Sequence, residues 1–230
     1  MNPEFWQNAW HNNQTNFTQK KPNFMLTQHF KTLNTRKNGR VFVPLCGKSV
    51  DMLWFITQGF DVVGVELVAT AVEQFFIEND LIATVTPHPI IPSLTCYQTE
   101  HLGQTLKIWV GDIFDLSAAD IGPIDALYDR GALVALPDNE PENLRTRYTQ
   151  KIMQLSNNAN QLLLSFAYDG EKQRHNNQKN TPPFLVTLAQ LETYYAKHYD
   201  INLLEREKAD YVSTAGDSGY RLVYALITNQ

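Results

Sequence analysis

Short apolar runs rich in valine, isoleucine and leucine alternate along the chain with longer segments in which apolar residues recur at helical spacing. Continuous apolar runs are typical of strands buried on both faces of a parallel sheet, and the longer period indicates amphipathic helices. The alternation predicts an α/β domain with a mostly parallel sheet and helices on both faces. The expected strands are residues 41–44, 62–65, 107–110, 124–128, 162–166 and 222–227.

The expected helices are residues 22–33, 49–58, 69–79, 141–155 and 187–198. Two stretches without such a pattern, residues 88–100 and 169–183, look mobile. The second stretch is too polar to pack in a core. Loops of its length in a compact domain are often lids or binding loops, and a solvated loop fits equally well.

An aromatic arm precedes the first expected helix. Phe5, Trp6, Trp10 and Phe17 are separated by polar residues that include asparagine and glutamine. Such rings either anchor a chain end in the core or fold over a ligand, and composition leaves both roles open.

Composition is that of an ordinary folded domain, with 43% hydrophobic and 19% charged residues among 230. The net charge of -5 gives no field that would attract phosphate backbones, so we expect no nucleic-acid partner. The chain starts without a basic region followed by an apolar stretch, and no apolar run approaches the roughly 20 residues that span a bilayer. We expect a single cytoplasmic domain, residues 1–230, without membrane contact.

Cysteine and histidine usage points away from metal chemistry. Cys46 and Cys96 belong to no C-x-x-C pair, and the six histidines show no close ligand pairing. The sequence predicts neither a disulfide framework nor a metal site. Cys46 also lacks a histidine partner in the sequence, which argues against a nucleophilic role.

Residues 40–49 combine a strand, a tight turn and the start of a helix, with Gly47 in the turn. Ligands of open α/β sheets bind at such carboxyl ends of strands. Gly47-Lys48-Ser49 superficially matches a phosphate-binding loop, but that motif requires glycine where this chain has Phe42. The missing glycine excludes a nucleotide triphosphatase.

Glu66 ends the next strand, roughly 20 residues beyond the glycine turn, where dinucleotide-binding folds hold ribose hydroxyls. A carboxylate can accept from two vicinal hydroxyls at once, although an exposed strand-end glutamate is the alternative. The full G-x-G-x-x-G pattern is absent. The sequence therefore favours an adenosine ligand without phosphates over a pyrophosphate-containing cofactor such as NAD.

Two further strands end in polar residues. Asp112 and Ile113 follow the strand at 107–110, where a polar group could meet the edge of a nucleoside base and Ile113 could cover its face; a helix cap is the competing role for Asp112. Arg130 follows the strand at 124–128. It could form a structural salt bridge, bind the methionine carboxylate, or steer an electron-rich acceptor.

Together these segments resemble the thiopurine S-methyltransferase family, in particular its bacterial members. The resemblance implies a Rossmann-like, class I S-adenosylmethionine-dependent methyltransferase fold, with residues 1–36 forming an N-terminal arm and helix that cap the active site. The resemblance depends on long, distinctive strings of residues that extend from the aromatic arm to the loop that ends at residue 184. They are residues 5–6 with Trp10, 40–49, 62–66, 73–76, 111–116, 128–135 and 182–184.

The resemblance also implies site residues. Arg130 would be the catalytic residue between cofactor and acceptor, and Phe17, Pro183 and Phe184 would contact the acceptor. Thr18 stands where the family commonly has histidine, and Arg221 is a candidate for an acceptor-side arginine near the C-terminus. The implied S-adenosylmethionine-binding residues are Trp10, Leu45, Glu66, Asp112, Ile113 and Arg130.

The implied enzyme is a monomer that methylates thiopurines or other aromatic and heterocyclic thiols, with selenium and tellurium compounds as further acceptors. S-adenosylmethionine would be the cofactor and S-adenosylhomocysteine the product. One alternative is a halide or thiocyanate methyltransferase, since a related fold can serve small anions. The other is a non-catalytic protein that retains the S-adenosylmethionine pocket.

Overall fold

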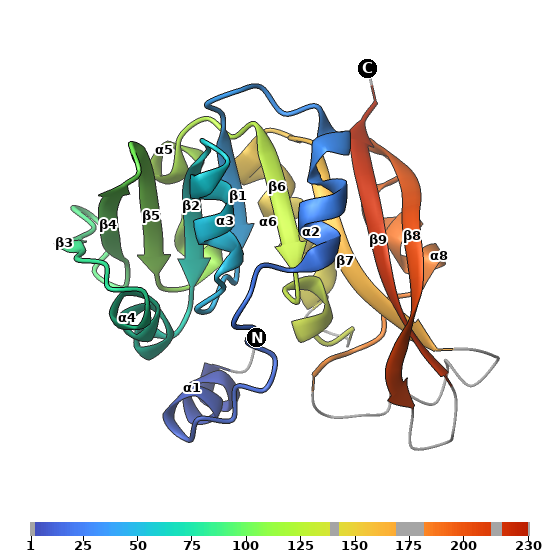
Figure 1. Cartoon of the computed structure of the whole chain (residues 1–230), viewed down its shortest axis with the longest axis horizontal. Helices are drawn as coiled ribbons and strands as arrows, with labels where there is room; N and C mark the ends of the chain where they lie inside the picture. Colours follow the sequence, from blue (N-terminus) through green and yellow to red (C-terminus); the bar gives the residue numbers. More distant parts are fainter. Residues whose placement is uncertain (1–2, 139–142, 169–181, 213–217, 230) are drawn as a thin grey trace.

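The computed structural model of the chain describes residues 3–138, 143–168, 182–212 and 218–229. In these residues one nine-stranded sheet runs in the order β3-β4-β5-β2-β1-β6-β7-β9-β8 (Figure 1). The strands are β1 (Arg40–Pro44), β2 (Asp61–Glu66), β3 (Thr84–Pro87), β4 (Thr95–His101), β5 (Gln104–Val110), β6 (Ala126–Arg130), β7 (Gln161–Tyr168), β8 (Tyr199–Val212) and β9 (Ser218–Thr228).

The five middle strands, β5-β2-β1-β6-β7, are parallel. The pairs β3-β4 and β9-β8 extend the sheet antiparallel on its two sides. Because parallel strands end at the same edge, β1, β2, β5 and β6 bring their last residues together. The mostly parallel α/β sheet expected from the sequence is confirmed.

Helices cover both faces of the sheet, with α2 and α3 in front in Figure 1 and α5, α6 and α8 behind. They are α1 (Pro3–His11), α2 (Phe24–His29), α3 (Asp51–Thr57), α4 (Ala69–Glu78), α5 (Ala118–Ile121), α6 (Leu144–Ser156) and α8 (Leu188–Tyr195). Three 3-10 turns accompany them: η1 (Phe30–Leu33), η2 (Ile113–Asp115) and η3 (Leu133–Ala135). Within the described residues, none of these helices could cross a membrane.

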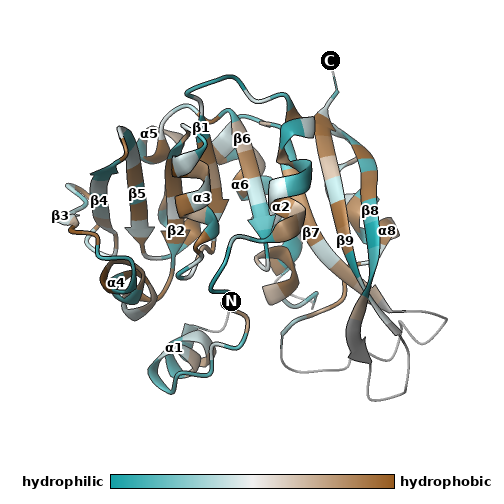
Figure 2. Ribbon diagram, in the orientation of Figure 1, coloured by the Kyte–Doolittle hydropathy of each residue, from teal (hydrophilic) through white to brown (hydrophobic). Residues whose placement is uncertain are grey.

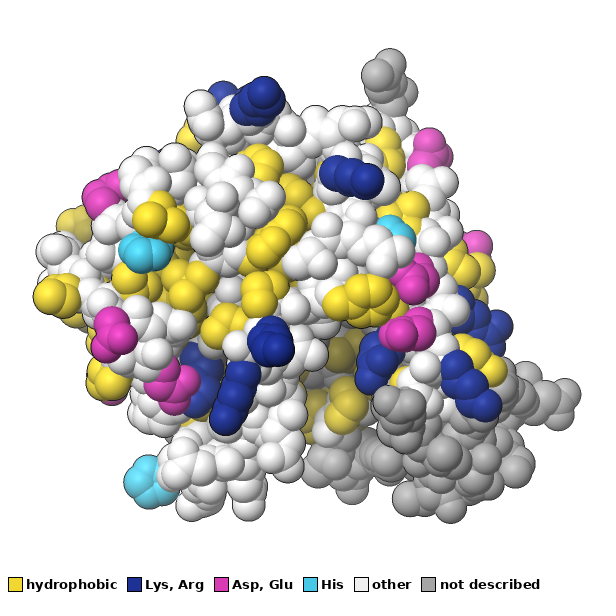
Figure 3. Space-filling model, in the orientation of Figure 1, with side chains coloured by type: hydrophobic (Ala, Val, Ile, Leu, Met, Phe, Trp, Pro, Cys, Tyr) yellow, Lys and Arg dark blue, Asp and Glu magenta, His cyan; other side chains and the backbone are white. Residues whose placement is uncertain are grey.

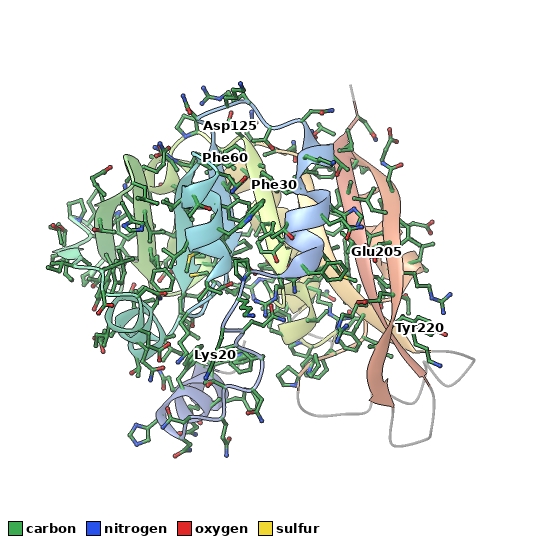
Figure 4. The ribbon with its side chains drawn as sticks, in the orientation of Figure 1. Lys20, Phe30, Phe60, Asp125, Glu205 and Tyr220 are labelled. Carbon is green, nitrogen blue, oxygen red and sulfur yellow. The ribbon has the colours of Figure 1, made fainter. Side chains whose placement is uncertain are left out.

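Hydrophobic cores fill the space on both sides of the sheet. On one side the Phe30 ring meets Phe55 and Phe60 at centroid separations of 4.8 and 5.4 Å, which joins η1 to the α3 region (Figure 4). On the other side Tyr148 and Tyr195 are fully buried. Each buried Phe or Leu contributes about 1.5–3 kcal/mol. Figure 2 shows predominantly hydrophobic middle strands, whereas the tip of β6 is hydrophilic.

All six expected strands are present, with ends shifted by a few residues, and the expected helix at 22–33 divides into α2 and η1. The expectation that residues 88–100 lack regular structure is wrong for residues 95–100. Residues Thr95–His101 form β4, which pairs antiparallel with β5. Its mostly polar, half-exposed residues suit a strand near a sheet edge, and they explain why no apolar run predicted it. Of the expected loop at 169–183, only Pro182 and Pro183 lie within the described residues.

Candidate active site

The aromatic arm packs against the carboxyl edge of the sheet, near the start of α4 (Figure 1). Trp10 is only 2% exposed and packs with Val68 and Ala71. The Phe17 ring meets Trp6 and Trp10 edge to face at centroid separations of 5.7 and 5.5 Å. Such pairs contribute about 0.5–1.5 kcal/mol beyond area burial. The arm is thus a helix plus a ring cluster with its own packing.

Beneath the arm lies a cavity of about 310 Å³ that the carboxyl edge of the sheet also lines. Hydrophobic side chains gather in a hollow on this side of the molecule, with Lys and Arg side chains nearby (Figure 3). The arm, the turn after β1, the end of β2, the segment after β6 and the two prolines all contribute. The lining residues include Phe5, Trp6, Trp10, Phe17, Leu45, Gly47, Glu66, Arg130, Val134, Ala135, Pro182 and Pro183.

The turn after β1 has an unusual backbone. Leu45 has φ 47° and Gly47 has φ 52°, a left-handed region that ordinary side chains rarely adopt. A Cβ atom on Gly47 would lie 3.1 Å from the Trp10 ring. The turn therefore needs glycine for its conformation, and the missing side chain leaves room for the arm's ring.

Glu66 closes this turn and lines the cavity. Its Oε2 accepts from the Gly47 amide at 2.8 Å and its Oε1 accepts from the Val68 amide at 3.0 Å. Burial raises the pKa of the Glu66 carboxyl, and the backbone amide bonds oppose that shift. Each carboxylate oxygen can still accept a further hydrogen bond, so ligand hydroxyls have acceptors here.

Arg130, the last residue of β6, joins three parts of the site. Its Nη2 donates to the carbonyl oxygen of Phe17 at 3.1 Å. Its Nη1 lies 3.4 Å from the Ser49 hydroxyl and 3.4 Å from an oxygen of Asp51. The guanidinium thus contacts the arm and the start of α3 while lining the cavity.

Sequence reasoning missed Asp51. The residue is fully buried, and its carboxylate accepts from the Asn23 amide at 2.7 Å and the Tyr128 hydroxyl at 3.0 Å. Burial, followed by the nearby Asp51 charge, raises the pKa of Tyr128 well above its usual value, so this phenol stays a donor. The available signal was an acidic residue two positions after the Gly47-Lys48-Ser49 turn, at the start of the helix.

A second buried carboxylate, Asp129, shapes the segment that lines the cavity after β6. Asp129 is buried and accepts from the Ala132 and Leu133 amides at 3.2 and 3.1 Å. The Tyr148 hydroxyl donates to its other oxygen at 2.8 Å. Burial raises the pKa of Asp129 to about 6. These bonds hold the chain that presents Val134 to the cavity.

Cys46 also lines the cavity. Burial, and then the charge of Glu66, raises the pKa of its thiol well above the usual value. The group is therefore a neutral thiol near pH 7, which makes it a weak nucleophile.

Six of the expected site residues come together around the cavity: Trp10, Phe17, Leu45, Glu66, Arg130 and Pro183. Asp112, Ile113 and Phe184 are not part of its lining as the described residues define it. Their expected ligand contacts stay predictions.

Local structure explains where these three residues lie. Asp112 caps η2, where its side chain accepts from the Phe114 amide at 3.0 Å. Ile113 is 1% exposed in the core. Phe184 is 9% exposed, and its amide donates to the carbonyl oxygen of Val134 at 2.7 Å. Arg221, the candidate acceptor-side arginine, bonds Glu207 at 3.1 Å on the outer strands instead.

Comparison with known proteins identifies the family. The model of the thiopurine S-methyltransferase family matches residues 1–223. The chain belongs to this family. A thiopurine S-methyltransferase of Psychrobacter cryohalolentis is 45% identical over 89% of each chain. One from Teredinibacter turnerae is 39% identical over 90% of this chain and 88% of its own.

Solved structures support the fold. A 1,6-didemethyltoxoflavin-N1-methyltransferase of Burkholderia thailandensis, solved with 1,6-didemethyltoxoflavin and S-adenosylhomocysteine bound, superimposes with a TM-score of 0.60. The match covers 99% of this chain and 87% of that chain at 14% identity. Both the family and the methyltransferase-type fold expected from the sequence are confirmed.

Proposed function

We propose that this protein is an S-adenosylmethionine-dependent S-methyltransferase that acts on thiopurines or other aromatic and heterocyclic thiols. Family membership and the names of the relatives support this activity. The observation that carries it is a single cavity in which Glu66, Arg130 and the aromatic arm meet. Such a cavity would offer Glu66 to a nucleoside, and apolar walls together with the Arg130 cation to an acceptor.

The residues around the turn fit S-adenosylmethionine. Glu66 would accept from the vicinal ribose hydroxyls, and Leu45 would cover the nucleoside. Trp10 would lie near the methionine part, while Asp112 and Ile113 would serve the adenine end on the strength of the family resemblance. When bound, S-adenosylmethionine supplies a methyl group on a positively charged sulfur.

The acceptor end suits a flat ring with a negatively charged sulfur. Phe17, Trp6 and Pro183 offer apolar surfaces to such a ring. Arg130 supplies a charge that favours the thiolate and orients it. Heteroaromatic thiols ionise readily near neutral pH, so the site needs no strong general base. Selenium and tellurium compounds are further acceptors by the same chemistry.

The protein's own contribution would be alignment and exclusion of water. Opposite charges disappear together in the transfer, and water stabilises the separated charges of the reactants, so a dry site lowers the barrier. The arm, through Trp10 and Phe17, covers the cavity. Good alignment supplies roughly 7–11 kcal/mol of a barrier in favourable cases.

A methylation screen tests the proposal. The protein is incubated with S-adenosylmethionine and aryl thiols, thiopurines, halides, thiocyanate, selenite or tellurite, with S-adenosylhomocysteine release as the readout. We expect turnover with the thiols. Turnover with halides or thiocyanate alone would replace the proposal by the small-anion alternative, and cofactor binding without any turnover would indicate a binding protein. Monomeric action and a cytoplasmic location stay predictions.

A further inference from the structure

Asp51 is a buried carboxylate that lies behind the cavity wall and does not itself line the cavity in the described structure. Its two oxygens gather groups from separate parts of the chain. Oδ1 accepts from the Asn23 amide at 2.7 Å, just before α2. Oδ2 accepts from the Tyr128 hydroxyl at 3.0 Å and faces Nη1 of Arg130 at 3.4 Å.

Strand geometry explains why β6 supplies two of these groups. Tyr128 and Arg130 are two residues apart on β6, so their side chains leave the same face of the sheet. That face carries α3, which begins at Asp51. A buried carboxylate requires a partner charge and hydrogen bonds, and Arg130 is the cation recorded beside it in the described residues.

The same network fixes both ends of the segment that joins the arm to α2. At one end the Phe17 carbonyl accepts from Arg130 at 3.1 Å, and at the other the Asn23 amide donates to Asp51. Lys20 marks the middle of this segment in Figure 4, between α1 and α2. The orientation of Arg130 and the placement of the arm are therefore linked through one carboxylate.

We propose that Asp51 is a positioning residue for methyl transfer, which aims the Arg130 guanidinium at the acceptor and fastens the segment from Phe17 to Asn23 over the cavity. The proposal rests on the proposed function, because it assigns Arg130 to the acceptor. Asp51 acts through Arg130 and through the arm, since its own atoms are behind the wall.

The test is a double-substitution cycle with Asp51→Asn and Arg130→Ala, using turnover of an aryl thiol. Asn keeps the size of the side chain but removes its charge and one acceptor oxygen. Misalignment of a catalytic group can lower a reaction rate by up to about a hundredfold. We expect Asp51→Asn alone to lower kcat about tenfold. The dissociation constant of S-adenosylmethionine should change by less than about twofold. In the Arg130→Ala background, adding Asp51→Asn should lower kcat by less than about a further twofold, because the effects of substituting two coupled residues are not additive.

Asp125→Asn is the matched control. Asp125 also accepts from an arginine, Arg36, and from a backbone amide, that of Arg40 at 2.8 Å. It lies at the opposite edge of the sheet from Lys20 and the arm (Figure 4). We expect Asp125→Asn to lower the melting temperature while kcat stays near the wild-type value.

Tyr128→Phe provides a second variant if Asp51→Asn does not fold. It removes one hydrogen bond to Asp51 and keeps the ring in the core. We expect a loss in kcat of about threefold, which disappears in the Arg130→Ala background. Three results would overturn the proposal. The first is a loss of kcat that is as large in the Arg130→Ala background as in wild type, and the second is wild-type turnover in both Tyr128→Phe and Asp51→Asn. The third is a loss of kcat in Asp125→Asn as large as that in Asp51→Asn.

Amide hydrogen exchange separates failure of this proposal from failure of the proposed function. With S-adenosylmethionine bound, exchange across residues 17–23 should be faster in Asp51→Asn than in wild type, whether or not a thiol is methylated. If wild type binds the cofactor but methylates no thiol, the function fails while the exchange result still decides the role of Asp51. Unchanged exchange would overturn that role.

Discussion

The proposed cofactor end and the proposed acceptor end of the cavity are constructed differently. At the cofactor end, Glu66 bonds the amides of Gly47 and Val68, all within the turns that follow two neighbouring strands. At the acceptor end, Arg130 bonds the carbonyl of Phe17 across 113 positions of the sequence. The first set of bonds lies within the edge of the sheet, whereas the second joins the sheet to the arm.

This difference separates affinity from turnover. Changes at the proposed cofactor end should alter S-adenosylmethionine binding first, because Glu66 would contact the cofactor directly. Changes at the acceptor end should alter alignment and acceptor binding, because its groups come from distant segments. The predictions for Arg130, Glu66 and Phe17 test that separation, and the one for Asp129 tests the stability of the segment after β6. They run from the largest expected effect to the smallest.

Arg130→Ala should lower kcat/KM for an aryl thiol by about a hundredfold, because both the fixed charge and the bond to the arm are lost. Arg130→Lys should lower it less, since the charge survives without the planar fork. Steady-state kinetics measure both variants. Arg36→Ala is the control, because Arg36 lies beside Asp125 at the edge of the sheet opposite the arm. It should leave kcat/KM near the wild-type value. Wild-type rates in both Arg130 variants would make this residue a structural ion-pair partner.

Glu66→Ala should weaken S-adenosylmethionine binding by about 1–3 kcal/mol, the scale of charge-assisted hydrogen bonds. It also leaves the Gly47 and Val68 amides without this acceptor, so some stability is lost. Glu66→Gln keeps one acceptor oxygen and should weaken binding with a smaller fall in melting temperature. Calorimetric titration measures the affinity, with Glu100→Gln on β4 as the control. Unchanged affinity in the folded variants would remove Glu66 from the ribose site.

Asp129 should make stability depend on pH. Its pKa is about 6 in the folded chain against an ordinary 3.8, so the folded chain holds this proton more tightly. Its contribution to the free energy of unfolding is therefore greatest below about pH 4 and falls as pH rises to about 6. Relative to Asp129→Asn, wild type should lose on the order of 1–2 kcal/mol over this interval in urea unfolding. A constant difference between the two proteins would show that Asp129 does not titrate there.

Phe17→Leu should raise the KM of an aryl thiol about threefold, because two edge-to-face ring contacts are lost. Cofactor affinity should be nearly unchanged, in keeping with the separation of the two ends. Phe24→Leu is the control, since Phe24 is similarly exposed and is not among the cavity residues. A larger effect on S-adenosylmethionine affinity than on the thiol KM would break the separation.

Hydrophobic periodicity was sufficient for the buried strands but not for the outer ones. The apolar runs at β1 and β2 predicted those strands almost to the residue, because both faces of each strand are covered. The strands β4 and β8 were missed because their sequences are polar and their positions lie toward the sides of the sheet. The arm's helix, α1, was also missed, since its tryptophans gave no evident partner in sequence.

The sequence alone determined the family, the turn after β1 and the strand end at Glu66, because the strings at residues 40–49 and 62–66 encode local backbone geometry. Only the tertiary structure decided that Asp51 faces Arg130, and that Arg130 bonds the arm. Those contacts join residues 79 and 113 positions apart. Local periodicity records which residues are buried, whereas the pairing of distant polar groups depends on how the sheet and the arm pack together.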